Sequence, residues 1–204
     1  GATGMWMHSM ITLSSVLVSV LICFVIGVPL GVLASYNKWY RDIQNVVLDA
    51  MQTLPYFCYL IPVLMFFGGN IVSAVIATVI YSVPPIIRLT ALGLSQVSGG
   101  YSEVSKSFGG TGIQTLNKVK FPLAVPSLVM GFNQTVIMAF AMQIVTPLIG
   151  GKGLGLQVFN ALQRSDTGRG LSAGLAIVLL AIIIDRITHA WTKKQRQALG
   201  LDQS

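Results

Sequence analysis

Four polar residues interrupt an apolar stretch at a spacing that places them on one face of a helix. Asp49, Gln52, Thr53 and Tyr56 follow an i, i+3, i+4, i+7 pattern. Polar groups inside an apolar span are costly, so they tend to face a water-filled cavity or a partner. The stripe predicts a surface that lines a path for a polar solute, or a gate on that path. The alternative is a contact with a sister helix, with Asp49 near the lipid headgroups.

Two further polar residues, Asn133 and Gln143, lie in a later apolar stretch. At 100° per residue they are about 80° apart around a helix, and we add them to the candidate path. Aromatic rings attract quaternary ammonium groups, and four of them lie nearby in the sequence: Tyr56, Phe57, Tyr59 and Tyr81. Packing is the commoner role of aromatic residues in such segments.

Catalytic and metal-binding patterns are not found in the sequence. His8 and His189 are isolated, and we expect both at membrane interfaces; Cys23 and Cys58 lie in apolar runs, and we expect both to be buried. The glycine-rich stretch around Lys152 lacks the Gly-Lys-Ser/Thr of a phosphate loop, so we expect a tight turn there. The sequence therefore predicts no catalytic residue, cofactor or metal site in this chain.

The composition predicts an all-α integral membrane protein. Of 204 residues, 53% are hydrophobic and only 9% are charged, against about 25% charged in soluble domains. A membrane helix needs about 20 mostly apolar residues. Five stretches qualify, at about 10–34, 43–67, 71–94, 122–149 and 171–191. We expect them to form a single transmembrane domain over 1–204, with kinks or breaks at Pro29, Pro55 and Pro62.

Basic residues predict the orientation. If the polar loop at 101–121 is cytoplasmic, five spans place the start of the chain outside and its end inside. Ten of the thirteen basic residues, including Arg88 near a cytoplasmic helix end, are then cytoplasmic; the exceptions are Lys152, Arg164 and Arg169. This fits the positive-inside rule, so the net charge of +7 indicates loops at a membrane rather than a nucleic-acid surface. Because the sequence begins with Gly1, we expect it to be processed or truncated.

The polar loop at 101–121 predicts a helix–turn–helix projection. Glu103 to Phe108 can form a short helix, and Gly109, Gly110 and Gly112 allow a tight turn. Residues 113–119 can form a second helix, with Ile113, Leu116 and Val119 on one face, before Pro122 opens the next span. Such a projection is either a docking surface or a loop lying on lipid headgroups.

The same loop resembles a known motif. Glu103, then Gly109 six residues on, then Val119-Lys120-Phe121-Pro122, resembles the "EAA" loop of ABC importer permeases. That motif reads Glu-Ala-Ala, three residues, Gly, nine residues, Ile-x-Leu-Pro; Val104, Ser105, Val119 and Phe121 are mild departures. The resemblance implies that the loop couples to an ATPase through these residues: Glu103, Val104, Ser105, Ser107, Phe108, Gly109, Gly110 and Pro122.

The resemblance extends over about residues 10–190. Segments such as "MQTLPYFCYLIPVLMFFG" and "LIGGKGLG" are similar to the permease subunits of glycine betaine/proline betaine importers. It implies a type I ABC importer permease in the bacterial cytoplasmic membrane, itself no enzyme. Its partners would be a second permease copy, a solute-binding protein and a cytoplasmic ATPase dimer that holds ATP and magnesium. Choline, carnitine or an amino acid are alternative solutes, and a secondary transporter is the alternative class. The sequence leaves open whether two identical permeases pair.

Overall fold

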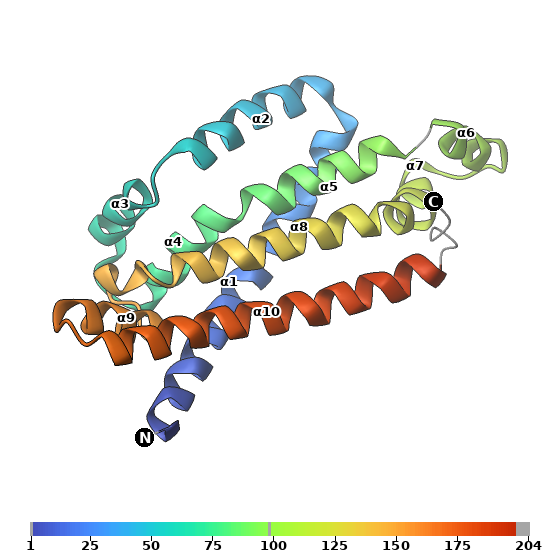
Figure 1. Ribbon diagram of the computed structural model, residues 1–204. Helices are drawn as coiled ribbons and strands as arrows, with labels where there is room; N and C mark the ends of the chain where they lie inside the picture. Colours follow the sequence, from blue (N-terminus) through green and yellow to red (C-terminus); the bar gives the residue numbers. More distant parts are fainter. Residues whose placement is uncertain (1, 98, 199–204) are drawn as a thin grey trace.

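The computed structural model describes residues 2–97 and 99–198, with side chains described except at 2–4, 102, 106 and 191–198. The described backbone is helical, with short turns and without strands (Figure 1). The helices are α1 (Ala2–Tyr36), α2 (Lys38–Thr53), α3 (Phe57–Phe67), α4 (Ile71–Ser82), α5 (Pro84–Gln96), α6 (Gly99–Ser107), α7 (Gly112–Thr115), a π-helical turn (Leu116–Lys120), α8 (Phe121–Met142), a 3-10 turn (Thr146–Ile149), α9 (Leu154–Gln163) and α10 (Thr167–Ala198).

Four of the described helical stretches are long and apolar enough to cross a membrane. They are Met5–Tyr36, Ile71–Gln96, Gly112–Met142 and Thr167–Ala190. The second joins α4 to α5 without a break, since Pro84 occupies the first turn of α5, where its missing N–H is tolerated. A fifth crossing results if α2 and α3 form one bent span. The predicted all-α membrane architecture is therefore confirmed.

The second predicted span, 43–67, differs from a single helix. It consists of α2 and α3, which meet at 95°. Pro55 supplies the reason, because the residue before a proline is driven out of the helical region. Leu54 is accordingly extended, with φ −69° and ψ 131°. Pro29 and Pro62, by contrast, lie inside α1 and α3.

The fourth predicted span, 122–149, is shorter than expected. α8 ends at Met142, and a turn and the 3-10 helix complete the stretch. Gly150 and Gly153 then adopt positive φ values of 91° and 99° and form the turn that the glycine-rich stretch predicts. The short helix α9 that follows was not predicted.

Close glycine contacts build the core of the bundle. A Cβ on Gly27 would lie 2.4 Å from Ile86, and one on Gly31 would lie 2.6 Å from Thr90, so α1 and α5 touch backbone to side chain. Gly93 makes the same kind of approach to Ser127, which joins α5 to α8. Gly27 and Gly31 have the Gly-x-x-x-Gly spacing that predicts close helix contact, and their approach to α5 confirms that prediction.

The bundle has two distinct ends. α6 and α7 project at one end, beside the last described turns of α10, and α3 and α9 cover the other (Figure 1). α2 and α3 run along one side of the bundle, and α2 contributes a single buried residue, Leu48.

Candidate functional site

The predicted projection is present as α6, a glycine turn and α7. Gly109 has φ +77°, a conformation that side chains disfavour, and the Gly110 N–H donates to the Ser105 carbonyl at 2.9 Å. Thr111 and Gln114 form a reciprocal capping box at the start of α7. The Ser105 and Thr115 hydroxyls, 2.8 Å apart, tie the two helices together. The projection is therefore a locally fixed structure.

Apolar side chains are exposed on this projection. Phe108 is 88% exposed, Ile113 74%, and Tyr101 and Val104 57% each. Glu103 is exposed beside them. The predicted ridge of Ile113, Leu116 and Val119 is not continuous: Leu116 and Val119 are half-buried, and Leu116 packs on the core. The exposed apolar side chains lie instead on α6, at Phe108 next to the turn, and at Ile113 in α7.

The projection is joined to the bundle without a break. The Phe121 N–H bonds the Leu116 carbonyl five residues back, which makes the π turn, and α8 continues through Pro122. Pro122 has no N–H to donate to the carbonyl four residues earlier, and its ring would clash with that carbonyl. The wider π turn just before it relieves the clash. The Lys120 ammonium lies 5.4 Å from the centre of the Tyr36 ring and links the turn to the end of α1.

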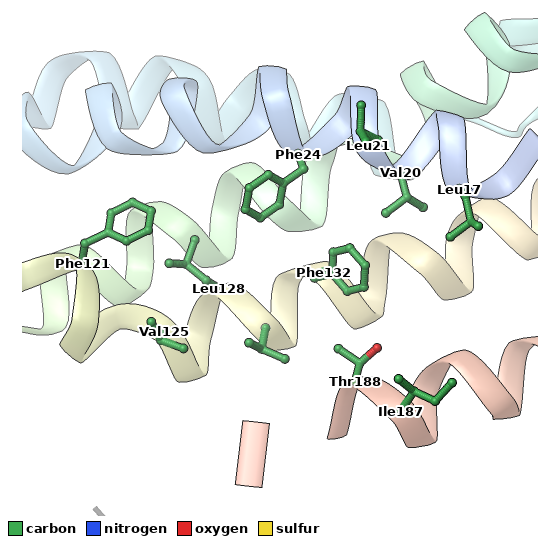
Figure 2. Close-up of a pocket in the computed structure, with 11 residues that line it drawn as sticks. Leu17, Val20, Leu21, Phe24, Phe121, Val125, Leu128, Phe132, Ile187 and Thr188 are labelled. Atoms are coloured by element: carbon green, nitrogen blue, oxygen red, sulfur yellow. The ribbon is translucent and has the colours of Figure 1, made fainter. Parts of the chain in front are cut away.

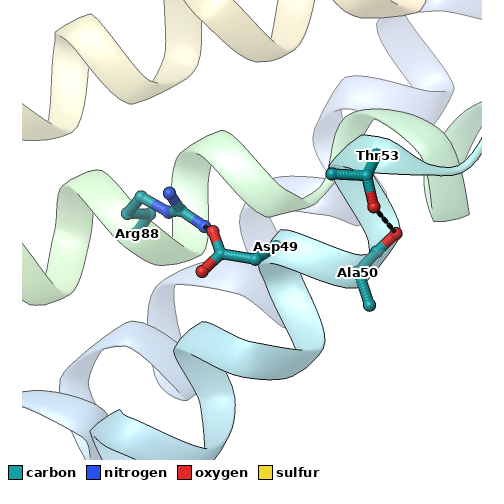
Figure 3. Close-up of polar contacts among 4 residues, drawn as sticks. All are labelled: Asp49, Ala50, Thr53 and Arg88. Carbon is teal, nitrogen blue, oxygen red and sulfur yellow. Dashed lines mark hydrogen bonds and ion pairs between the residues drawn. The ribbon is translucent and has the colours of Figure 1, made fainter.

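The polar stripe of the second span is only partly formed. Asp49, Gln52 and Thr53 are exposed on α2, but the helix ends at Thr53, and Tyr56 is the N-cap residue before α3. The expectation that all four share one helix face is wrong, because the break at Pro55 intervenes. The Thr53 hydroxyl donates to the Ala50 carbonyl of its own helix at 3.0 Å (Figure 3).

Arg88 is a site residue that sequence reasoning missed. Its Nη2 lies 2.6 Å from Oδ1 of Asp49, so an ion pair joins α5 to α2 (Figure 3). We expected Arg88 near a helix end, but α5 continues for eight residues beyond it, to Gln96. The pairing could not be read from local spacing, since the partners are 39 residues apart.

The four aromatic residues do gather. The ring centroids of Tyr56 and Phe57 are 4.8 Å apart, and Tyr81 lies edge-on to Tyr56 and Tyr59 at 6.5 and 6.2 Å. The Tyr59 hydroxyl also donates to the Met51 carbonyl, across the break between α2 and α3. The cluster thus lies where the bent pair meets the end of α4.

Asn133 and Gln143 are buried in this chain, unlike the α2 residues. Gln143 is 2% exposed, directly follows α8, and reaches the Thr78 hydroxyl on α4 at 3.5 Å. Asn133 is 8% exposed, and its Oδ1 has no partner among the described residues. Neither side chain shares the open surface of Asp49.

One expectation about a single residue needs correction. Cys58 is exposed rather than buried, because α3 turns that side of its helix away from the bundle, whereas Cys23 is buried as expected. His8, expected at a membrane interface, contacts α9: its Nε2 is 3.0 Å from the Gln157 side-chain nitrogen. The Leu154 N–H also donates to Thr12 at 2.8 Å, so α9 folds back onto α1.

A cavity of about 760 Å³ lies between α1, α8 and α10 (Figure 2). Its lining is apolar apart from Thr188, whose hydroxyl donates to the Ile184 carbonyl. It offers nothing to a polar solute. In the described part of the chain, no cluster of His, Cys, Asp and Glu could hold a metal ion.

Comparison with known proteins identifies the family. Residues 27–197 match the family described as "Binding-protein-dependent transport system inner membrane component". The chain is 44% identical to the glycine betaine/proline betaine transport system permease protein ProW of Escherichia coli (strain K12), over 96% of this chain and 55% of that protein. It is 45% identical to the glycine betaine/carnitine transport permease protein GbuB of Listeria monocytogenes serotype 1/2a (strain 10403S), over 94% of this chain and 68% of that protein. The chain thus spans about half the length of ProW.

A solved structure shares the fold. A chain of the MetNI methionine ABC transporter, in an inward-facing conformation, superposes with a TM-score of 0.79 at 23% identity, over 91% of this chain and 93% of that one. The fold is the ABC importer permease fold expected from the resemblance. With the family match over most of its length, this chain belongs to the inner membrane components of binding-protein-dependent transport systems.

Proposed function

We propose that this chain is the permease subunit of an ATP-driven importer for a compatible solute such as glycine betaine or proline betaine. The observation that carries the proposal is the sequence identity of 43–45% to permeases that are all named for glycine betaine, one of them for proline betaine as well. GbuB is named for carnitine as well, so carnitine is the nearest alternative solute. Choline or an amino acid would be more distant alternatives.

The partners follow from the same reading. A cytoplasmic ATPase dimer, which holds ATP and magnesium, docks on the α6–α7 projection, and this chain hydrolyses nothing itself. The exposed Phe108, Val104 and Ile113 suit a groove on such a partner. A solute-binding protein approaches the opposite end, near α9, and a second permease copy completes the path. In this orientation the N-terminus is outside and the C-terminus cytoplasmic.

Uptake in proteoliposomes tests the solute and the energy source. The full-length permease would be reconstituted with its neighbouring ATPase and binding protein, and labelled glycine betaine competed with choline, carnitine, proline and histidine. We expect uptake that requires ATP and that only quaternary amines inhibit. ATP-dependent uptake of a different solute would keep the permease and replace the solute, whereas uptake without ATP would favour a secondary transporter.

Two variants test the docking projection. Glu103→Arg reverses an exposed charge, and Gly109→Leu places a side chain at φ +77°, so both should lower ATP-driven uptake at least tenfold or release the ATPase from the complex. Gly99→Ala is the matched control, because a Cβ there meets nothing within 4 Å. Normal uptake and co-purification of both variants would show that the ATPase docks elsewhere.

A further inference from the structure

The ion pair between Asp49 and Arg88 is the starting observation. Among the residues whose side chains are described, it is the only pair of full opposite charges that joins two different helices. The two side chains are nevertheless open, with Arg88 38% and Asp49 64% exposed. The Arg88 Nε is buried and has no hydrogen-bond partner in the described part of the chain. The guanidinium therefore has donor capacity that Asp49 does not use.

Arg88 lies well inside its span, eight residues or about 12 Å from the end of Ile71–Gln96 at 1.5 Å per residue. Asp49 lies near the C-terminal end of α2, eleven residues from its start at Lys38 and four from its end at Thr53, beside the Pro55 break. Charged side chains within a membrane span are expensive against hydrocarbon and normally face a partner or a water-filled cavity. Both side chains are open in this single chain, so the space beside them is available to a partner subunit or to water.

The pair joins a loosely held element to a fixed one. α2 buries only Leu48 and ends at the Pro55 break, whereas α5 lies in the glycine-packed core. Figure 3 shows the Asp49 and Arg88 side chains reaching toward each other between their two helices. Opening the pair would free α2 from one of its few polar contacts with the bundle.

We propose that Asp49 and Arg88 form a zwitterion-exchange contact on the solute path. The carboxylate of the solute pairs with the guanidinium of Arg88, while the cationic group of the same solute pairs with Asp49. Each protein charge exchanges an internal partner for one on the solute, so both keep a charged partner during the passage. The proposal deepens the proposed function, on which it rests for the class of solute.

The aromatic cluster lies along the same helix face. Tyr81 precedes Arg88 by seven residues, which places it on the same side of the α4–α5 helix, about two turns or 10 Å away. Its ring stands edge-on to those of Tyr56 and Tyr59. Aromatic faces attract quaternary ammonium groups, so a solute moving along this face meets an uncharged contact first and the charged pair second.

Charge variants of the full complex test the exchange. Asp49→Asn and Arg88→Gln each leave one charge unpaired, and we expect at least a tenfold loss of labelled glycine betaine uptake from either. The double variant Asp49→Asn/Arg88→Gln keeps two polar side chains without charge, and its uptake should remain at least tenfold below that of the wild type. The swap Asp49→Arg/Arg88→Asp restores both charges and should recover a large part of the uptake. Val47→Ala, on the other side of α2, is the control and should transport normally.

The neutral double variant separates a contact that needs charge from a latch that needs only side-chain contact between α2 and α5, because such a latch would work as well with the neutral pair as with the swap. A purely ionic latch is distinguished by the labelling experiment below, since only exchange predicts that the solute protects the site. Full uptake in Asp49→Asn/Arg88→Gln would overturn the proposal. Wild-type complex that shows no ATP-dependent uptake of glycine betaine would instead count against the proposed function.

A labelling experiment detects the contact between solute and protein without measuring transport. Gln52→Cys, one turn from Asp49, would be introduced with Cys58→Ser, which removes the exposed native thiol. We expect a membrane-impermeant cationic thiosulfonate to label Cys at 52, and glycine betaine to slow it at least threefold, while choline, which has no carboxylate, does not. Adding Asp49→Asn/Arg88→Gln should abolish the protection. If glycine betaine does not change the labelling rate, the proposal is overturned, whatever the transport assay shows.

Discussion

The α5–α8 seam and the α2–α3 pair are built in opposite ways. In the seam, small residues bring backbones together: a Cβ on Gly93 would lie 2.5 Å from the Ser127 Cβ. In the pair, large apolar side chains point outward, with Phe66 84% and Met65 80% exposed. Lipid tails are as apolar as a leucine side chain, so helices in a membrane associate through close packing rather than through burial of apolar surface. The seam is therefore the frame of the molecule, and the bent pair is the part that is free to move or to be covered.

Gly93→Ala should have the most widespread effect, because it disturbs the seam between two membrane-spanning helices. Its methyl group has no space against Ser127, so we expect the free energy of unfolding to fall by about 1–3 kcal/mol. Gly174→Ala is the matched control, since nothing lies within 4 Å of a Cβ there and a helical alanine gains about 0.5–1 kcal/mol. Unfolding midpoints in lipid nanodiscs would show shifts of opposite sign. Equal shifts would mean that the seam is no tighter than the periphery.

Leu48→Ala should act locally. Leu48 is the buried anchor of α2 and packs against Cys23, Val83 and Ile86. Its truncation leaves a cavity, at a cost of about 1–3 kcal/mol once the smaller transfer term in lipid is considered. Hydrogen exchange should become faster in α2 while α5 and α8 stay protected, and the exposed Val47→Ala should change neither. Faster exchange throughout the bundle would contradict an independently held α2.

Tyr59→Phe should give the smallest effect. It removes the hydrogen bond from the Tyr59 hydroxyl to the Met51 carbonyl, worth about 1 kcal/mol. Spin labels on α2 and α3 should report a broader distance distribution across the break. Tyr40→Phe is a fitting control on α2, because the Tyr40 hydroxyl makes no hydrogen bond to the described residues. An unchanged distribution would mean that the Pro55 break alone sets the angle.

Local patterns in the sequence were enough for the apolar spans, the glycine contact of α1, and the helix–turn–helix projection. Each depends on neighbouring residues: hydropathy over about 20 positions, glycine spacing, or two short helical segments on either side of a glycine turn. The prolines were recognised, but only Pro55 breaks its span, and the choice among the three depends on surrounding packing.

Long-range contacts explain what the sequence did not reveal. The Asp49–Arg88 pair, the His8–Gln157 contact and the return of α9 onto Thr12 join residues 39 to 149 positions apart. No periodicity encodes which helices will be neighbours. The exposure of Cys58 has the same origin, since an apolar run indicates lipid or core but not which of the two.

The unbroken passage from α7 through the π turn into α8 has a mechanical consequence. Gly112–Met142 is one helical stretch of 31 residues, about 46 Å long. Such a rod carries a tilt at its projecting end to its other end. A tilt of about 5° at the projection would displace the far end, next to Gln143, by about 4 Å, given this length. A small tilt at one end of the helix therefore displaces its other end by about the size of a side chain.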